Sequence, residues 1–376
     1  MNQDTYKPGL DGVIAGECAI ACAEQGTLLY RGYEIGDLAG HTTFEEVVYL
    51  LLYGELPNRE QLESLKSTLF SLRPLPAEVM QALRLIPHDA GAMDVLRSMV
   101  SMAGHFDPVA DNQPDALRRR ALWLLAQIAG IIAARNRLQN GQEPLPPKPG
   151  LGHAAQILYQ ALGVEPEPAA AKLFDLTLIL YAEHEFNAST FTARVICSTQ
   201  SDMVSAVVGA IGALKGPLHG GANEAVTRTL TRFDTAEEAR TWIREALARK
   251  EKVIGFGHRV YKTGDHRARI LEHEVRPLAA AKGAANLIEI FDAIREIMEN
   301  EKKIYANLDY PSGLAYFLLG LPIDLYTPIF AASRVSGWCA HYIEQRENNR
   351  LYRPLSRYTG PARRNLFPLD DRPESR

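Results

Sequence analysis

The sequence predicts a mainly α-helical protein with few strands. Helix-start signals, in which Thr or Asn is followed three residues later by Glu or Gln, recur along the chain. Stripes of apolar residues three and four positions apart follow these signals, as expected of amphipathic helices. Strand patterns occur only in residues 12–33, where two short runs flank Glu24-Gln25-Gly26 and predict a short N-terminal β-hairpin.

Five helices can be predicted in order from these signals. The capping pairs that begin the first three are Thr42 with Glu45, Asn58 with Gln61, and Thr235 with Glu238. Apolar residues at helical spacing in 287–298 predict a fourth helix. Thr327 is expected to be the N-cap of a fifth helix, with Pro328 at its first position and an end near Glu344.

Residues 121–134 form the longest nearly apolar stretch of the chain. A membrane-spanning helix needs about 20 such residues, so this stretch predicts a buried helix and no membrane span. The proline-rich residues 143–149 and 165–168 are expected to connect helices. The first residues lack the basic and apolar regions of a signal peptide, so a cytoplasmic protein is expected.

Length, charge and cysteine content limit the possible functions. At about 150 residues per domain, 376 residues predict two or three domains. A formal net charge of -4 and a pI of about 6.2 disfavour a nucleic-acid-binding protein. The cysteines lack the second Cys/His pair of a zinc motif, so we expect free thiols and no metal site. They are Cys18, Cys22, Cys197 and Cys339.

Four segments place a reactive side chain among Gly, Pro or Asn residues, as loops do when they approach a ligand. They are residues 182–190 with His184, 215–224 with His219, 253–267 with His258, and 306–313 with Asp309. Taken singly, each histidine is more simply a structural residue, and Asp309 could begin a turn. The Gly255-Phe256-Gly257 run lacks the third glycine and the βαβ context of a dinucleotide loop.

Together, three of these segments resemble the signature regions of the citrate synthase family, in the same order. They read Gly-Pro-Leu-His-Gly-Gly-Ala-Asn from residue 216, Gly-Phe-Gly-His-Arg-Val-Tyr-Lys from residue 255, and Asn-Leu-Asp-Tyr from residue 307. The resemblance extends from Leu10 to Gly360, nearly the whole chain. It is to the short form of the family, without an N-terminal regulatory domain.

The resemblance implies a two-domain helical fold and a shared active site. A large domain is expected to contain residues 1–220 and 320–376, and a small domain residues 221–319. A homodimer is expected, in which Arg353 reaches the active site of the neighbouring subunit. The catalytic residues would lie on both domains, so that closure of the domains completes the site and excludes water.

The resemblance also assigns roles to residues that match the family's motifs. The catalytic residues would be Asp309 as base, His219 at the thioester oxygen, and His258 at the ketone of oxaloacetate. The residues expected to bind oxaloacetate are His184, His258, Arg267, Arg334 and Arg353. The residues expected near coenzyme A are Gly255, Phe256, Gly257 and Lys262. No cofactor is expected, because the coenzyme A thioester is itself a substrate.

The implied reaction joins an acyl-CoA to oxaloacetate and then hydrolyses the thioester. Citrate synthase uses acetyl-CoA in the tricarboxylic acid cycle, and 2-methylcitrate synthase uses propionyl-CoA. One methylene in a pocket is worth only about 1–3 kcal/mol, and the sequence does not distinguish the two. A non-catalytic ligand-binding or scaffold protein of the same fold is a further alternative, but it would be expected to lack Asp309, His219 or His258, and all three are present.

Three positions depart from the family pattern. His266 stands where proline is common, which makes the orientation of Arg267 uncertain. Glu183 stands where aspartate is common. The run Tyr310-Pro311-Ser312 differs from the usual aromatic residue followed by Tyr or Phe and Ser, near the expected acyl pocket.

Overall fold

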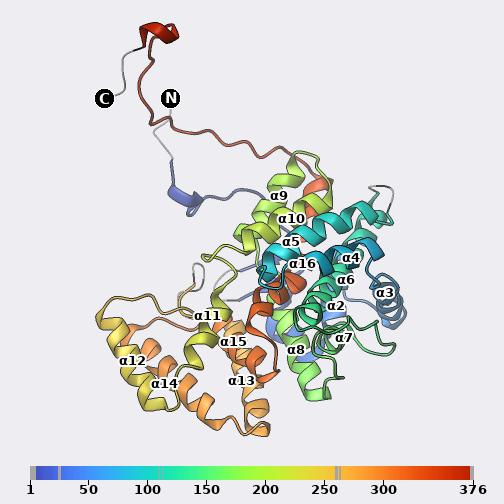
Figure 1. Ribbon diagram of the computed structural model, residues 1–376, viewed down its shortest axis with the longest axis vertical. Coiled ribbons are helices and arrows are strands. Elements are labelled where there is room, and N and C mark those ends of the chain that lie inside the picture. Colours follow the sequence, from blue (N-terminus) through green and yellow to red (C-terminus); the bar gives the residue numbers. More distant parts are fainter. Residues whose placement is uncertain are drawn as a thin grey trace.

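The computed structural model describes residues 6–23, 27–109, 111, 113–258, 261 and 264–372. Within them the chain is mainly α-helical, as predicted, and Figure 1 shows helices throughout the body. The α-helices are α1 Ile35–His41, α2 Phe44–Tyr53, α3 Arg59–Ser71, α4 Ala77–Leu85, α5 Ala92–Ala103, α6 Pro114–Gln139, α7 His153–Leu162, α8 Pro168–Tyr181, α9 Ala188–Ser198, α10 Met203–Leu214, α11 Ala222–Leu230, α12 Ala236–Ala248, α13 His266–Ala281, α14 Ala285–Lys302, α15 Asp309–Leu318 and α16 Tyr326–Glu347.

The N-terminal β-hairpin is confirmed and gains a third strand. Strand β1 (Ala21–Cys22) pairs antiparallel with β2 (Leu29–Tyr30), and β2 pairs antiparallel with β3 (Tyr33–Glu34). The predicted turn at Glu24-Gln25-Gly26 lies outside the described residues. The third strand leads directly into α1, so the small sheet fixes the start of the helical body.

Two predicted helix starts were wrong, because the hydroxyl groups involved bond elsewhere. The capping box of α2 is formed by Thr43 and Glu46, since the Thr42 hydroxyl donates to the Leu38 carbonyl at 2.6 Å and ends α1 instead. Helix α16 begins at Tyr326, so Thr327 lies inside the helix, where its hydroxyl donates to Glu224 Oε1 at 2.5 Å, with the Gly220 carbonyl further away at 3.3 Å. The predicted caps of α3 (Asn58) and α12 (Thr235) are confirmed.

Helices α6 and α16 form the centre of the larger group of helices. They pack against each other, and α16 also contacts α8, α9 and α10. Residues 121–136 of α6 are all buried, which confirms the predicted core helix. In the described part of the chain, no helix combines the length and apolar character needed to cross a membrane.

Helices α11 to α15 gather on one side of the molecule, apart from α2 to α7 (Figure 1). In this group α12 packs on α14, and α15 packs on α11 and α13. Helix α13 also contacts α8 of the larger group. The loops before α13 and before α15 carry the third and fourth sequence segments, so they lie where the two groups of helices meet.

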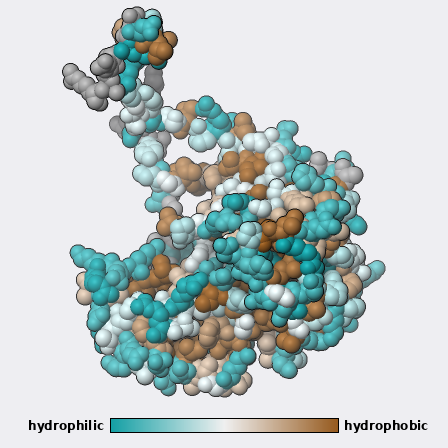
Figure 2. Space-filling view, viewed as in Figure 1, coloured by the Kyte–Doolittle hydropathy of each residue, from teal (hydrophilic) through white to brown (hydrophobic). Residues whose placement is uncertain are grey.

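Both described ends of the chain extend from the body as one arm, shown at the top of Figures 1 and 2. Residues 351–367 have no regular secondary structure, and almost all of them are exposed. Leu355 and Leu366 are 88% and 89% exposed. Other large apolar side chains of residues 351–369 are exposed as well, and a group of this kind is typical of a segment that packs against another surface.

Candidate active site

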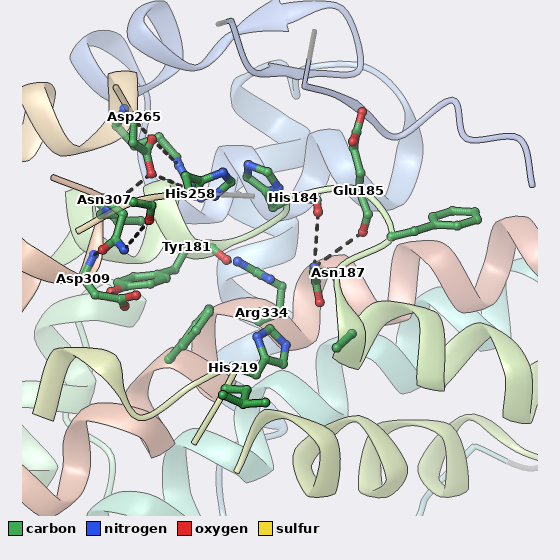
Figure 3. A pocket seen from close by; sticks show the side chains of 17 residues that line it. Tyr181, His184, Glu185, Asn187, His219, His258, Asp265, Asn307, Asp309 and Arg334 are labelled. Atoms are coloured by element: carbon green, nitrogen blue, oxygen red, sulfur yellow. Dashed lines mark hydrogen bonds and ion pairs between the residues drawn. The ribbon is translucent and has the colours of Figure 1, made fainter. Parts of the chain in front are cut away.

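A cavity of about 440 Å³ brings the four sequence segments together. The predicted residues that line it are His184, His219, Gly257, His258, Arg267, Asp309 and Arg334. Figure 3 shows Asp309 beside Tyr181 at one side of this cavity, with Arg334 between His219 and the pair of His184 and His258. These side chains come from three loops, from the first turns of α13 and α15, and from the middle of α16, so the site exists only in the folded chain.

Asp309 is the first residue of α15, and it is held by two neighbours. Its backbone N–H donates to Asn307 Oδ1 at 3.1 Å. The phenol of Tyr181, the last residue of α8, donates to Asp309 Oδ1 at 2.6 Å. Burial raises the pKa of Asp309 to about 6, against the opposing effects of this hydrogen bond and of the Arg267 charge. A carboxylate of this kind is ionised at neutral pH and is a stronger base than an exposed aspartate.

His219 lies in the turn after α10 and is held in one tautomer by Ser189. The Ser189 backbone N–H, which can only donate, points at His219 Nε2 at 3.3 Å. The Ser189 hydroxyl is 2.8 Å from the same nitrogen and accepts from Trp338 Nε1 at 3.0 Å. Burial and the Arg334 charge lower the pKa of His219 to about 4. The imidazole is therefore neutral at pH 7, with its proton on Nδ1.

His258 and His184 form a pair of rings with centroids 5.1 Å apart. The backbone N–H of Tyr261 donates to His258 Nδ1 at 3.2 Å, so a neutral His258 carries its proton on Nε2. The Tyr261 hydroxyl is 3.0 Å from His184 Nε2. Burial and the neighbouring Arg267 hold the pKa of His184 well below its usual range, so this ring adds no positive charge to the cavity.

The two arginines in the cavity differ in their partners. Asp265 binds Arg267 with both oxygens, at 3.0 Å to Nε and 2.8 Å to Nη2. Arg334 donates from Nε to the Tyr181 carbonyl at 2.5 Å and lies over the Phe330 ring. Within the described residues no carboxylate lies within ion-pair distance of Arg334. A buried guanidinium without a carboxylate partner is an anion-binding group, because an incoming carboxylate supplies the missing charge.

Asp265 fixes the orientation of Arg267, although His266 stands where the family commonly has proline. Asp265 is the N-cap of α13, and its carboxylate accepts from the Arg267 backbone N–H at 3.1 Å as well as from the guanidinium. Its Oδ2 also accepts from the Leu308 backbone N–H at 3.2 Å. The orientation of Arg267 is thus set by a buried ion pair, and His266 occupies the first helical position, where proline would be tolerated equally well.

The residues expected near coenzyme A separate into those that line the cavity and those beneath it. Gly257 lines it, whereas Phe256 is buried and pairs with Ala306 in an isolated β-bridge. Gly255 has φ 91°, and a Cβ there would lie 2.6 Å from Val226 Cγ2. Gly255 and Phe256 therefore hold two of the loops together. Lys262 lies outside the described residues.

Arg353 does not line the cavity of its own chain. It lies just beyond α16, where the exposed arm begins, and is itself exposed.

Three cavity residues for which the sequence predicted no role are Tyr181, Asn307 and Phe330. Tyr181 and Phe330 lie in apolar helical stretches, where a sequence predicts core packing, so no local signal distinguished them.

One group of side chains outside the cavity has the composition of a metal site. Ligand atoms of Cys18, His341 and Glu344 lie within 4.8 Å of one another. The ring of His341, however, already contacts Glu183 Oε1 and Arg194 Nη1, each at 2.9 Å. Burial raises the pKa of the Cys18 thiol to about 11, so the thiolate that a metal requires is disfavoured. An arginine beside the ligand atoms makes the group a poor fit for a cation.

Comparison with known proteins identifies the family. The family model described as citrate synthase, C-terminal domain, matches residues 9–355. The chain belongs to the citrate synthase family. It is 44% identical to 2-methylcitrate synthase 1 of Corynebacterium glutamicum, over 99% of this chain and 100% of that protein. It is equally 44% identical to citrate synthase 2 of Bacillus subtilis, over 98% and 100% of the two chains.

A solved structure agrees with this assignment. The ternary complex of carboxymethyl coenzyme A and oxaloacetate with citrate synthase from Thermoplasma acidophilum matches with a TM-score of 0.91 and 33% identity, over 97% of this chain and 99% of that one. The predicted citrate-synthase-like helical fold is thus confirmed. As a member of this family, the protein is an enzyme, a condensing acyltransferase of the citrate and 2-methylcitrate synthase type.

Proposed function

We propose that this enzyme condenses acetyl-CoA with oxaloacetate and water to give citrate and free coenzyme A. One observation carries the proposal. An ionised buried carboxylate, a neutral imidazole with a fixed tautomer, and an arginine that has no carboxylate partner among the described residues all line one cavity. These are the base, the hydrogen-bond donor and the anion site that the condensation of a thioester with a 2-oxo dicarboxylate requires.

In the first step Asp309 removes a proton from the α-carbon of the thioester. The Tyr181 phenol already donates to Asp309 Oδ1, so Asp309 Oδ2 is the oxygen available to accept this proton. Negative charge then develops on the thioester oxygen, to which Nδ1–H of His219 donates. A positioned base contributes about 100- to 10,000-fold, so the orientation of the two substrates must supply much of the remaining acceleration.

In the second step the enol carbon attacks the ketone carbon of oxaloacetate and forms the new carbon–carbon bond. Nε2–H of His258 donates to the ketone oxygen, which takes up one proton as it becomes a hydroxyl, and Asp309 gives up the proton it removed from the α-carbon, so protons balance over the two steps. Arg334 and Arg267 bind the carboxylates, with Arg334 the stronger site because its charge has no carboxylate partner in the described chain. Water then cleaves the thioester and releases coenzyme A, so the chemistry uses side chains and water and no cofactor.

We propose that the site is completed by a second copy of the chain and by closure of two domains. Arg353 lies on the arm, outside its own cavity, and the arm exposes large apolar side chains. A homodimer in which each arm packs against the partner would bury these side chains and bring Arg353 to the partner's oxaloacetate. Residues 221–319 would form the small domain that closes over the larger one, carrying His258 and Asp309 with it.

The alternative substrate is propionyl-CoA, which would give 2-methylcitrate, because a relative with 44% identity has that name. A thiol-release assay with oxaloacetate and either thioester tests both, with Asp309→Ala as the inactive control. Release that depends on oxaloacetate and is lost in the variant supports the synthase. The larger of the two kcat/KM values identifies the acyl group. Absence of release with both thioesters would refute the proposed function.

A further inference from the structure

We propose that Tyr181 is a positioning residue for the base, a role that rests on the proposed function of Asp309. Its phenol holds Asp309 Oδ1 and directs Oδ2 toward the thioester. Tyr181 is separated from Asp309 by 128 positions in the sequence, and the two meet where the end of α8 contacts the start of α15.

The phenol of Tyr181 can act only as a donor in this contact. An ionised carboxylate has no proton to give, so the hydrogen between the two oxygens belongs to Tyr181. Burial, together with the charge of Asp309, holds the pKa of Tyr181 well above its usual range, so the phenol keeps its proton. At 2.6 Å the bond has the length of a charge-assisted hydrogen bond, the stronger class.

Within the described residues, Tyr181 is the side chain that can orient the Asp309 carboxylate. Among the described residues, no other side chain donates to the Asp309 carboxylate. Asn307 contacts only the Asp309 backbone, which fixes the start of the helix and not the rotation of the carboxylate. The Tyr181 ring packs against Phe330 with centroids 4.3 Å apart and is 2% exposed. A rigid donor that water cannot easily replace therefore sets which oxygen faces the cavity.

Tyr181 also contacts Arg334, the proposed carboxylate-binding residue, but through its backbone and not through its phenol. Its backbone carbonyl accepts from Arg334 Nε at 2.5 Å. A change from Tyr to Phe removes the phenol hydroxyl and leaves this carbonyl in place. The effects on the base and on oxaloacetate binding can therefore be separated, because Tyr181→Phe is expected to alter proton removal and to leave the KM for oxaloacetate unchanged.

The test compares the pH profile of Tyr181→Phe with those of the wild type and of Tyr326→Phe. Tyr326 is also buried, and its hydroxyl bonds to no ionised group in the described structure, so the second variant removes a buried hydroxyl that does not contact the base. Loss of a hydrogen bond to the ionised base raises its pKa. We expect the acid limb of kcat/KM for the thioester to move up by roughly one pH unit in Tyr181→Phe.

We further expect kcat of Tyr181→Phe to fall about tenfold and the isotope effect with a thioester deuterated at the α-carbon to rise, because proton removal becomes slower. A pH profile and isotope effect equal to those of Tyr326→Phe would overturn the proposal. So would equal losses in both variants without any shift of the acid limb. Full activity of Asp309→Ala would instead refute the role of the base, and with it the proposed function.

Discussion

At the scale of single residues, burial decides which active-site groups carry charge. It raises the pKa of the Asp309 carboxyl to about 6 and lowers the pKa of the His219 imidazole to about 4, which reverses the usual order of these two groups. At neutral pH the Asp309 carboxylate is ionised and the His219 imidazole is neutral. The remaining positive charge without a carboxylate partner in the described cavity is on Arg334, where a dianionic substrate would use it.

The first prediction concerns the base. Asp309→Asn keeps the shape of the side chain and a carbonyl oxygen for Tyr181, but it removes the basic oxygen. We expect kcat to fall by about 100- to 10,000-fold with the fold intact. Thiol release measures the loss, and circular dichroism checks the fold. The exposed Asp324→Asn is the matched control, and an Asp309→Asn enzyme as active as this control would contradict the assignment.

The second prediction concerns stability against pH. The pKa of His219 is about 4 when folded and about 6.5 when unfolded, so between these values the unfolded chain binds a proton that the native chain does not. His219 therefore lowers the free energy of unfolding as pH falls from 6.5 to 4. The raised pKa of Asp309 acts in the opposite direction, so the comparison must be between variants.

We expect His219→Gln to lose less stability than the wild type over this pH interval, measured by urea denaturation at several pH values. The exposed His273→Gln serves as control and should follow the wild type. Parallel pH curves for His219→Gln and the wild type would show that His219 is not held neutral by the fold.

At the scale of secondary-structure elements, a buried chain of charged groups joins the segment after α8 to α9 and α16. Glu183 contacts His341, which contacts Arg194, and Arg194 pairs with Glu344 at 2.6 Å. Glu183 directly precedes His184, and Arg194 lies in α9 with Ser189, so these contacts hold both segments against α16. Glu183, the residue that departs from the family pattern, reaches His341 with its longer side chain.

The third prediction concerns the space for Glu183. Gly337 in α16 lies beneath it, and a Cβ at this position would be 2.5 Å from the Ala182 carbonyl oxygen and would clash with the Glu183 carboxylate. We expect Gly337→Ala to lower the free energy of unfolding by about 1–3 kcal/mol, measured by urea denaturation. Gly40→Ala in α1 meets no atom within 4 Å and should be neutral or stabilising by up to about 1 kcal/mol. Equal stability of the two variants would contradict this packing.

At the scale of the whole molecule, the cavity lies between two groups of helices, and one arginine expected to bind substrate lies outside it. His219 and Arg334 come from the side of α10 and α16, whereas His258 comes from the loop before α13 and Asp309 from the start of α15. Arg353 lies on the arm. The proposed role of Arg353 in binding oxaloacetate would therefore need a partner subunit as well as the folded chain.

The fourth prediction tests the shared site by complementation. Arg353→Ala and Asp309→Asn are each expected to be nearly inactive alone. When they are unfolded together and refolded, a mixed dimer has one site with an intact Asp309 and an intact Arg353 from the partner. If half of the dimers are mixed and each has one good site, about a quarter of the wild-type thiol release should return. No recovery, in a mixture shown by sedimentation to contain dimers, would place Arg353 outside the partner's site.

The helical class, the hairpin, the buried helix at residues 121–134 and the loops that carry the reactive side chains could all be predicted from the sequence. Each of these depends on local pattern, such as the period of apolar residues, capping residues, or glycine beside a histidine. Motif resemblance also indicated His184, His219, His258, Arg267, Asp309 and Arg334, all of which line the one cavity.

Only the tertiary structure decided how these groups work together. It placed the Tyr181 phenol on Asp309, the Ser189 N–H on His219 Nε2 and the Asp265 carboxylate on Arg267. It also moved two helix starts, because the Thr42 hydroxyl bonds to the Leu38 carbonyl and the Thr327 hydroxyl to the Glu224 carboxylate, which local pattern does not predict. The physical reason is that a charge or a tautomer depends on burial and on partners distant in the chain, which come together only when the helices pack.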